Sequence, residues 1–131
     1  MPTTIEVRSQ HHNDWIEITA EVRTAVKKSG LDQGVVTVFV PHTTAAVTIQ
    51  ENADPPLKVD ISQALDRLFP WNGPYGHGED NAAAHMKAVL TGTSERVPFA
   101  DGKLLLGTWQ SIFFCEFDGP RRRRVVIHVS P

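Results

Sequence analysis

The chain has 131 residues, of which 40% are hydrophobic and 21% are charged, and its formal net charge is −2 at pH 7. This length predicts a single domain, 1–131, because folded units most often have about 100 to 150 residues. No apolar run approaches the roughly 20 residues of a membrane span, and the charge lacks the basic excess of a nucleic-acid binder, so we expect no membrane or nucleic-acid partner. The first residues have no signal-peptide pattern and Cys115 is the single cysteine, which favours a cytoplasmic protein without an intrachain disulfide.

Apolar and polar residues alternate over 3–9 and again over 14–19. This period predicts two half-buried strands, which we expect to pair as a hairpin around the turn at 11–14. Thr19 is then a candidate N-cap for a short helix over 20–28, whose last turn is basic.

The middle of the chain predicts two strands and a helix. Residues 34–40 are rich in β-branched side chains, Pro41 ends this run, and extended structure resumes over 45–50. Residues 60–69 carry apolar side chains at helical spacing, and we expect that apolar stripe to pack on a sheet.

A loop rich in glycine over 71–78 precedes a helix over 81–90, for which Asp80 is a candidate N-cap. Strands are expected over 97–99 and 104–114, the second interrupted at Gly107, and over 125–130. Strands outnumber helices without strict alternation, which predicts an α+β domain with antiparallel or mixed sheets.

Three histidines lie in polar, turn-rich surroundings: His42, His77 and His85. Neutral imidazole is a common metal ligand and titrates near neutral pH, so their convergence would make a site for metal or proton chemistry. The alternative is that these polar side chains only form local hydrogen bonds. His42, Thr43 and Thr44 would then bond within their turn, and Asp80 would cap the following helix. His77 and His85 are eight residues apart and meet only if the loop folds back over the helix start.

Two further segments offer chemistry. Glu51, after the strand over 45–50, is a candidate general base or ligand, although an exposed loop acid is the commoner fate. The block Arg121-Arg122-Arg123-Arg124 follows a Gly-Pro turn. Alternate arginines of a strand point to one face, so Arg121 and Arg123 could hold a phosphate while the other two are solvated.

Five motifs in this order resemble the YjbQ family, small bacterial and archaeal proteins also described as secondary thiamine-phosphate synthases. The motifs are Pro41–Ala45, Glu51–Pro55, His77-x-Glu79-x-Asn81 with Ala84-His85, Leu106–Gln110 and Asp118-Gly119-Pro120-Arg121-x-Arg123.

The resemblance implies a sandwich-like α+β fold with a few helices on one side, a homotrimer, and histidines near a subunit interface. It implies that these histidines bind a divalent metal, zinc in the first instance, with magnesium as the alternative for a pyrophosphate substrate. It also implies a weak thiamine-phosphate synthase activity, a transferase reaction that joins a pyrimidine pyrophosphate to a thiazole phosphate and releases pyrophosphate.

Two hypotheses follow. The first is a metal-assisted enzyme acting on a small phosphorylated metabolite, with thiamine-phosphate synthesis as a secondary activity. The second is a trimeric metal-binding or ligand-binding protein without catalysis. The expected site residues, grouped as catalytic, substrate-binding and metal-binding, are Glu51, His42 and Asp80; Thr43, Thr44, Asn81, Arg121 and Arg123; and His42, His77 and His85.

Overall fold

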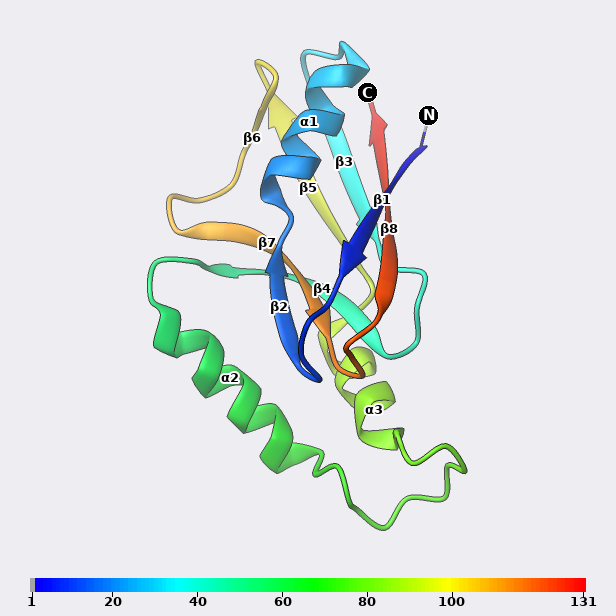
Figure 1. Ribbon diagram of the computed structural model, residues 1–131. Helices are drawn as coiled ribbons and strands as arrows, with labels where there is room; N and C mark the ends of the chain where they lie inside the picture. The colour runs from blue at the N-terminus through cyan, green and yellow to red at the C-terminus, as the bar shows by residue number, and fades with distance from the viewer. Residues whose placement is uncertain (1) are drawn as a thin grey trace.

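The computed structural model describes residues 2–131, which form two antiparallel sheets and three helices (Figure 1). The strands of the larger sheet lie in the order β1-β8-β3-β5-β6, and those of the smaller sheet in the order β2-β7-β4. The elements are β1 (Pro2–Arg8), β2 (Asp14–Glu17), α1 (Thr19–Ser29), β3 (Gly34–Phe39), β4 (Ala45–Glu51), α2 (Pro55–Leu68), α3 (Ala82–Thr91), β5 (Ser94–Ala100), β6 (Lys103–Leu104), β7 (Gln110–Glu116) and β8 (Arg122–Ser130). No helix in this described part of the chain is long and apolar enough to cross a membrane.

The predicted α+β, sandwich-like class is confirmed, but the predicted opening hairpin is wrong. β1 pairs with β8 in the larger sheet, whereas β2 pairs with β7 in the smaller one. Alternation along the sequence identifies a half-buried strand but not its partner. The segment between β1 and β2 therefore crosses from one sheet to the other.

Helix starts also differ from the expectations. Ile18 occupies the N-cap position of α1, and the Thr19 hydroxyl instead accepts a hydrogen bond from the backbone N–H of Ile112 at 2.9 Å. α2 begins at Pro55, five residues before the expected start, because proline has no N–H to lose in the first turn of a helix.

The strand β7 is buried on both faces, which explains its nearly continuous apolar sequence. Ile112 and Phe114 face the main core between the sheets, which α1 also covers. Phe113 and Cys115 face a second, smaller core that includes Ala84 and Ala88 of α3. The apolar run 112–115 predicts that Cys115 is a buried, structural residue, and this is confirmed: Cys115 is fully buried, and burial raises the pKa of its thiol.

A buried ion pair joins the two sheets at one end of the main core. Arg123 of β8 donates to the Glu116 carboxylate of β7 through Nε at 2.9 Å and through Nη2 at 2.5 Å. Their side chains are 4% and 0% exposed. Ser9 Oγ and the backbone N–H of Asp118 also donate to Glu116, and Thr44 accepts from Arg123. Every strong charge at this position therefore has a partner.

The hydrogen bonds decide the ionisation of Glu116. Burial alone raises the pKa of its carboxyl, but hydrogen bonds from Arg123, Ser9 and Asp118, with the Arg123 charge, outweigh burial. The net result is a pKa below the ordinary glutamate value, so the carboxylate is ionised at neutral pH.

We predict that Glu116→Gln lowers the free energy of unfolding by about 3–5 kcal/mol, because it leaves the Arg123 charge buried without a counterion. Urea denaturation measures this loss. Glu6→Gln is the matched control, since Glu6 is an exposed glutamate that also pairs with arginines, and it should change stability little.

The difference between wild type and Glu116→Gln should also depend on pH. A folded-state pKa below the unfolded one contributes stability above the ordinary carboxyl pKa of about 4.3, and this contribution is lost as the pH falls through the folded value. The two proteins should therefore converge in acid. A constant difference across this range would contradict the assignment.

Candidate functional site

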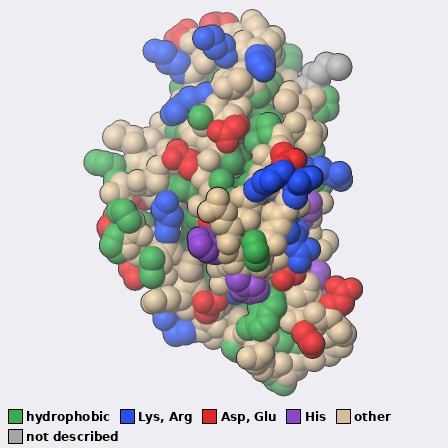
Figure 2. Space-filling view, in the orientation of Figure 1, with side chains coloured by type: hydrophobic (Ala, Val, Ile, Leu, Met, Phe, Trp, Pro, Cys, Tyr) green, Lys and Arg blue, Asp and Glu red, His purple; other side chains and the backbone are tan. Residues whose placement is uncertain are grey.

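A cleft of about 320 Å³ opens beside the buried Arg123–Glu116 pair. Three parts of the chain that are distant in sequence line it: the turn between β3 and β4, the residues before α3 with the first turns of that helix, and the turn between β7 and β8 with the start of β8. The lining residues are Pro41, His42, Thr43, Thr44, Glu79, Asn81, His85, Asp118, Arg121 and Arg123. Figure 2 shows histidine side chains next to arginine or lysine side chains on the side of the molecule where β8 lies.

Asp118 connects these segments. Its Oδ2 accepts a hydrogen bond from Asn81 Nδ2 at 2.9 Å and an ion-paired contact from Arg121 Nη2 at 3.1 Å. Its backbone carbonyl accepts from Arg121 Nε at 2.8 Å. The Arg121 side chain remains 49% exposed, so its guanidinium is oriented by Asp118 and still faces solvent. This combination suits an arginine that binds an anion.

The turn after β7 requires glycine at position 119. A Cβ atom there would lie 2.4 Å from the His11 carbonyl oxygen and 2.7 Å from Ser9 Oγ. Any larger residue would therefore displace the Ser9 hydroxyl, which donates to Glu116 and accepts from the backbone N–H of Arg121. Gly119 thus allows the segment carrying Asp118 and Arg121 to pack closely on the end of β1.

His42 is held as a neutral imidazole. Its Nε2 accepts a hydrogen bond from the backbone N–H of Arg124 at 3.0 Å. Burial, followed by the charge of Arg123, lowers the pKa of His42 below its ordinary value. With Nε2 as acceptor, the proton of the neutral ring is on Nδ1, which is then a hydrogen-bond donor for a ligand.

His77 and His85 lie together, as the folding back of the loop requires. Their ring centroids are 5.0 Å apart at an interplanar angle of 72°. Glu79 Oε2 is 3.9 Å from His77 Nε2, and both side chains are largely open to solvent. His85 lines the cleft that His42 also lines, whereas His77 stands beside it.

These histidines fit a metal ion only in part. Among residues 2–131, no three His, Cys, Asp or Glu side chains are arranged closely enough to hold one. The pair His77 and His85 offers two imidazoles, but the Nε2 atom of His42 is already used by Arg124. A closed site needs three or four ligands, so the chain by itself supplies an incomplete set.

The structure brings most of the expected site residues together. Those lining the cleft are His42, Thr43, Thr44, Asn81, His85, Arg121 and Arg123. The condition for a contact between His77 and His85, that the loop folds back over the helix start, is met in this structure.

Glu51 is not in this cleft. It ends β4 and pairs with Gln110 at the start of β7, whereas Ala45, beside the cleft, pairs with Glu116 at the other end. Six residues of strand span about 20 Å, so Glu51 does not reach the histidines of its own chain. Trp109, which we expect in the core from its apolar run, lies at this far end too and is 63% exposed.

Asp80 lies outside the cleft as well. It lines a separate hollow with Trp71, Tyr75 and His77, and its φ angle is +58°. The N-cap position of α3 is Asn81, so the expected capping role of Asp80 is wrong by one residue. Asp80 thus has a left-handed backbone between Glu79 and Asn81, both of which line the cleft.

Arg123 differs from its expected role. It was grouped with Arg121 for phosphate binding, but its guanidinium is buried against Glu116 and Thr44. β8 begins at Arg122, so strand alternation points Arg123 inward and its neighbours outward. Arg121 precedes the strand, and its hydrogen bonds to Asp118 hold its side chain at the cleft.

The sequence reasoning missed Glu116 and Ser9. A usable signal for Glu116 is its place at an inward position of a strand that is otherwise apolar, because a buried carboxylate implies a cationic partner. Ser9 offers no such signal, because its partners come from the other end of the chain.

Comparison with known proteins identifies the family of this chain. A family model described as UPF0047 protein YjbQ-like matches residues 3–131. The UPF0047 protein YugU of Bacillus subtilis is 43% identical over 128 residues, with 97% of each chain covered. A UPF0047 protein of Methanocaldococcus jannaschii is 44% identical over 124 residues, covering 95% of this chain and 90% of the relative.

Solved structures give the same result. An uncharacterized YjbQ/UPF0047 family protein from Clostridium acetobutylicum superposes with a TM-score of 0.96 at 46% identity, covering 98% of this chain and 99% of that one. A protein from Sulfolobus solfataricus, described as YbjQ-like and of unknown function, has a TM-score of 0.94 at 32% identity, covering 98% and 95%. The chain belongs to the YjbQ (UPF0047) family.

Proposed function

We propose that this protein is an enzyme that acts on a small phosphorylated metabolite bound in the cleft between His42 and Arg121. The observation that carries the proposal is that the half-exposed guanidinium of Arg121 opens onto the same cleft as two imidazoles. Asp118 uses the Nε and one Nη2 hydrogen bond of Arg121, so the remaining N–H groups of this guanidinium are the donors for a phosphate, and imidazoles are suited to moving a proton on or beside it.

Each cleft residue has a role in this proposal. Arg121, which is ion-paired with Asp118, donates hydrogen bonds to the phosphate, with the Nδ1–H of His42, the Thr43 hydroxyl and Asn81 as further polar contacts. His85 is the proton-transfer group, since within residues 2–131 no group hydrogen-bonds to its ring and both nitrogens are available. Thr44 acts indirectly, because its hydroxyl is used by Arg123.

In its narrowest form, the proposal is the thiamine-phosphate synthase reaction that the motifs suggested. The thiazole nitrogen forms a bond to the methylene carbon of the pyrimidine pyrophosphate while the carbon–oxygen bond breaks and pyrophosphate leaves. The groups that support this chemistry are Arg121 and His85, which would stabilise the leaving anion by charge and by proton donation.

The proposal includes a divalent metal, zinc in the first instance, with magnesium as the alternative when pyrophosphate is bound. When the metal is bound, His77 and His85 would hold it, and the metal would then replace proton donation from His85 in stabilising the leaving anion. A bound metal would supply Lewis-acid stabilisation of a phosphate oxygen. No step assigned here to His42 or Arg121 depends on it.

A homotrimer completes the proposal. α2 has no buried residue in the single chain, and Val59 and Leu68 on it are 55% and 64% exposed. Val89 of α3 is 85% exposed, and Figure 2 shows apolar side chains on the surface where α2 begins. Such faces favour self-association. In a homotrimer, Glu51 acts as general base only by reaching the histidines of a second chain.

The first experiment measures phosphate binding and turnover separately. Arg121→Ala should weaken binding of inorganic phosphate about tenfold or more in calorimetric titration, because the anion loses a charge-assisted hydrogen bond. Arg96→Ala, which removes an exposed arginine of β5 outside the cleft, is the control. His85→Gln should keep phosphate affinity and lose about a hundredfold in pyrophosphate release from the two thiamine precursors.

Equal phosphate affinity in wild type and Arg121→Ala would contradict the proposed site. Phosphate binding without turnover of those precursors would instead support the non-catalytic binding protein.

The metal prediction distinguishes the three histidines. We expect elemental analysis of untagged protein to find a divalent transition metal that is lost in His77→Ala and His85→Ala and retained in His42→Ala. The reason is that His42 Nε2 is engaged by the Arg124 backbone. Protein that stays metal-free after supplementation would contradict the metal, and loss in His42→Ala would contradict this ligand assignment.

Glu51 is tested by mixing inactive subunits. If Glu51 of one chain serves the histidines of another, Glu51→Gln and His85→Gln are each inactive, but coexpressed subunits recover part of the turnover. A mixture of His85→Gln and His42→Gln subunits is the control. It should not recover turnover, because both histidines of a cleft come from one chain and every cleft of the mixture lacks one of them. Full activity of Glu51→Gln alone would end its proposed role.

A further inference from the structure

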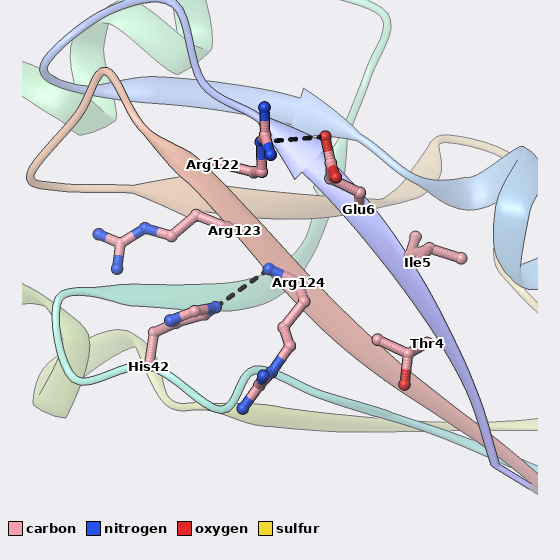
Figure 3. A pocket seen from close by; sticks show the side chains of 7 residues that line it. All are labelled: Thr4, Ile5, Glu6, His42, Arg122, Arg123 and Arg124. Carbon is pink, nitrogen blue, oxygen red and sulfur yellow. Dashed lines mark hydrogen bonds and ion pairs between the residues drawn. The ribbon is translucent and has the colours of Figure 1, made fainter.

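A second hollow, of about 410 Å³, lies against the outer side of the larger sheet where β8 begins (Figure 3). Its lining residues are Thr4, Ile5, Glu6, His42, Arg122, Arg123 and Arg124. Nothing in the proposed chemistry uses Arg122 or Arg124, which the sequence suggested were simply solvated.

Strand geometry puts both of these arginines on the outer face. Arg122 and Arg124 are two residues apart on β8 and exposed, whereas Arg123 between them is buried. β1 runs alongside in an antiparallel register that pairs Glu6 with Arg124, so β1 forms the other wall of the hollow.

The charges in this hollow do not cancel. Glu6 Oε1 accepts from Arg8 Nε at 2.8 Å and lies 3.5 Å from Arg122 Nε, so this carboxylate is shared by two arginines. Arg123 is neutralised by Glu116. Within residues 2–131, Arg124 forms no ion pair with any carboxylate. The hollow is therefore cationic, with Arg124 as its unneutralised charge.

This hollow is adjacent to the cleft. His42 and Arg123 line both of them, and His42 is fixed to β8 by the hydrogen bond from the Arg124 backbone. Arg121 and Arg124 are three residues apart on nearly extended chain, which separates their Cα atoms by roughly 10 Å. A linear molecule of about this length, with an anionic group at each end, would span the distance between the two arginines.

We propose that the hollow at Arg124 is a second anion subsite, and that the ligand of this protein carries two anionic groups, one at Arg121 in the cleft and one at Arg124 beyond His42. This inference rests on the proposed function, because it assumes an anion at Arg121. It narrows the substrate class to metabolites with anionic groups, phosphate or carboxylate, at both ends.

The probe is a series of linear alkanes with a phosphonate at each end, compared with alkyl monophosphonates of the same length. In calorimetric titration at fixed salt, the best-fitting bisphosphonate should bind wild type about tenfold or more tightly than its monophosphonate partner. Arg124→Ala should remove this advantage while leaving the monophosphonate affinity unchanged. Arg124→Lys should restore part of it, since the charge returns without the guanidinium fork.

Arg96→Ala is the matched control, because Arg96 is an exposed arginine on β5 of the same sheet and lines neither hollow. It should keep the full bisphosphonate advantage. An equal loss in Arg96→Ala and Arg124→Ala would reduce the effect to general charge and overturn the subsite.

The two proposals fail in different ways. Monophosphonate binding that depends on Arg121, without any bisphosphonate advantage at any length, would overturn the second subsite and leave the proposed function intact. Absence of phosphonate binding altogether, or binding insensitive to Arg121→Ala, would overturn the proposed function together with the two-anion ligand.

Discussion

The buried pair of Arg123 and Glu116 is the constraint on which the rest of this structure depends. It joins the inner faces of the two sheets at one end of the main core, and neither charge is tolerable there without the other. Ser9, Thr44 and the backbone of Asp118 make further hydrogen bonds with the pair. The ends of β1 and β7 and the starts of β4 and β8 are thereby fixed together.

The cleft follows from that arrangement. Asp118, held by Glu116 through its backbone, orients Arg121 and Asn81 through its side chain. Arg121 precedes β8 and faces the cleft. Within β8 the side chains alternate, so Arg123 points inward and neutralises Glu116, whereas Arg122 and Arg124 face the outer hollow. Four consecutive arginines thus lie in three different environments, so the charge of the run does not by itself predict the role of each residue.

Prediction from sequence succeeded where the signal is local. Three histidines in polar contexts indicated a shared region, and two of them line one cleft with the third beside it. It failed for Glu51, because a residue close in sequence to the site lies at the other end of its strand. It failed also for the opening hairpin, since β1 pairs with a strand more than a hundred residues away and β2 with a strand about a hundred residues away.

The sequence by itself determined the class of the fold, its strand-rich character, the buried Cys115 and the motifs that mark the family, because periodicity and composition are properties of neighbouring residues. Only the tertiary structure decided that Arg123 is a structural counterion, that His42 is a neutral donor and that Arg124 faces a hollow of its own. These roles depend on burial and on partners from distant strands. Burial and partners set both the pKa of a group and its availability to a ligand.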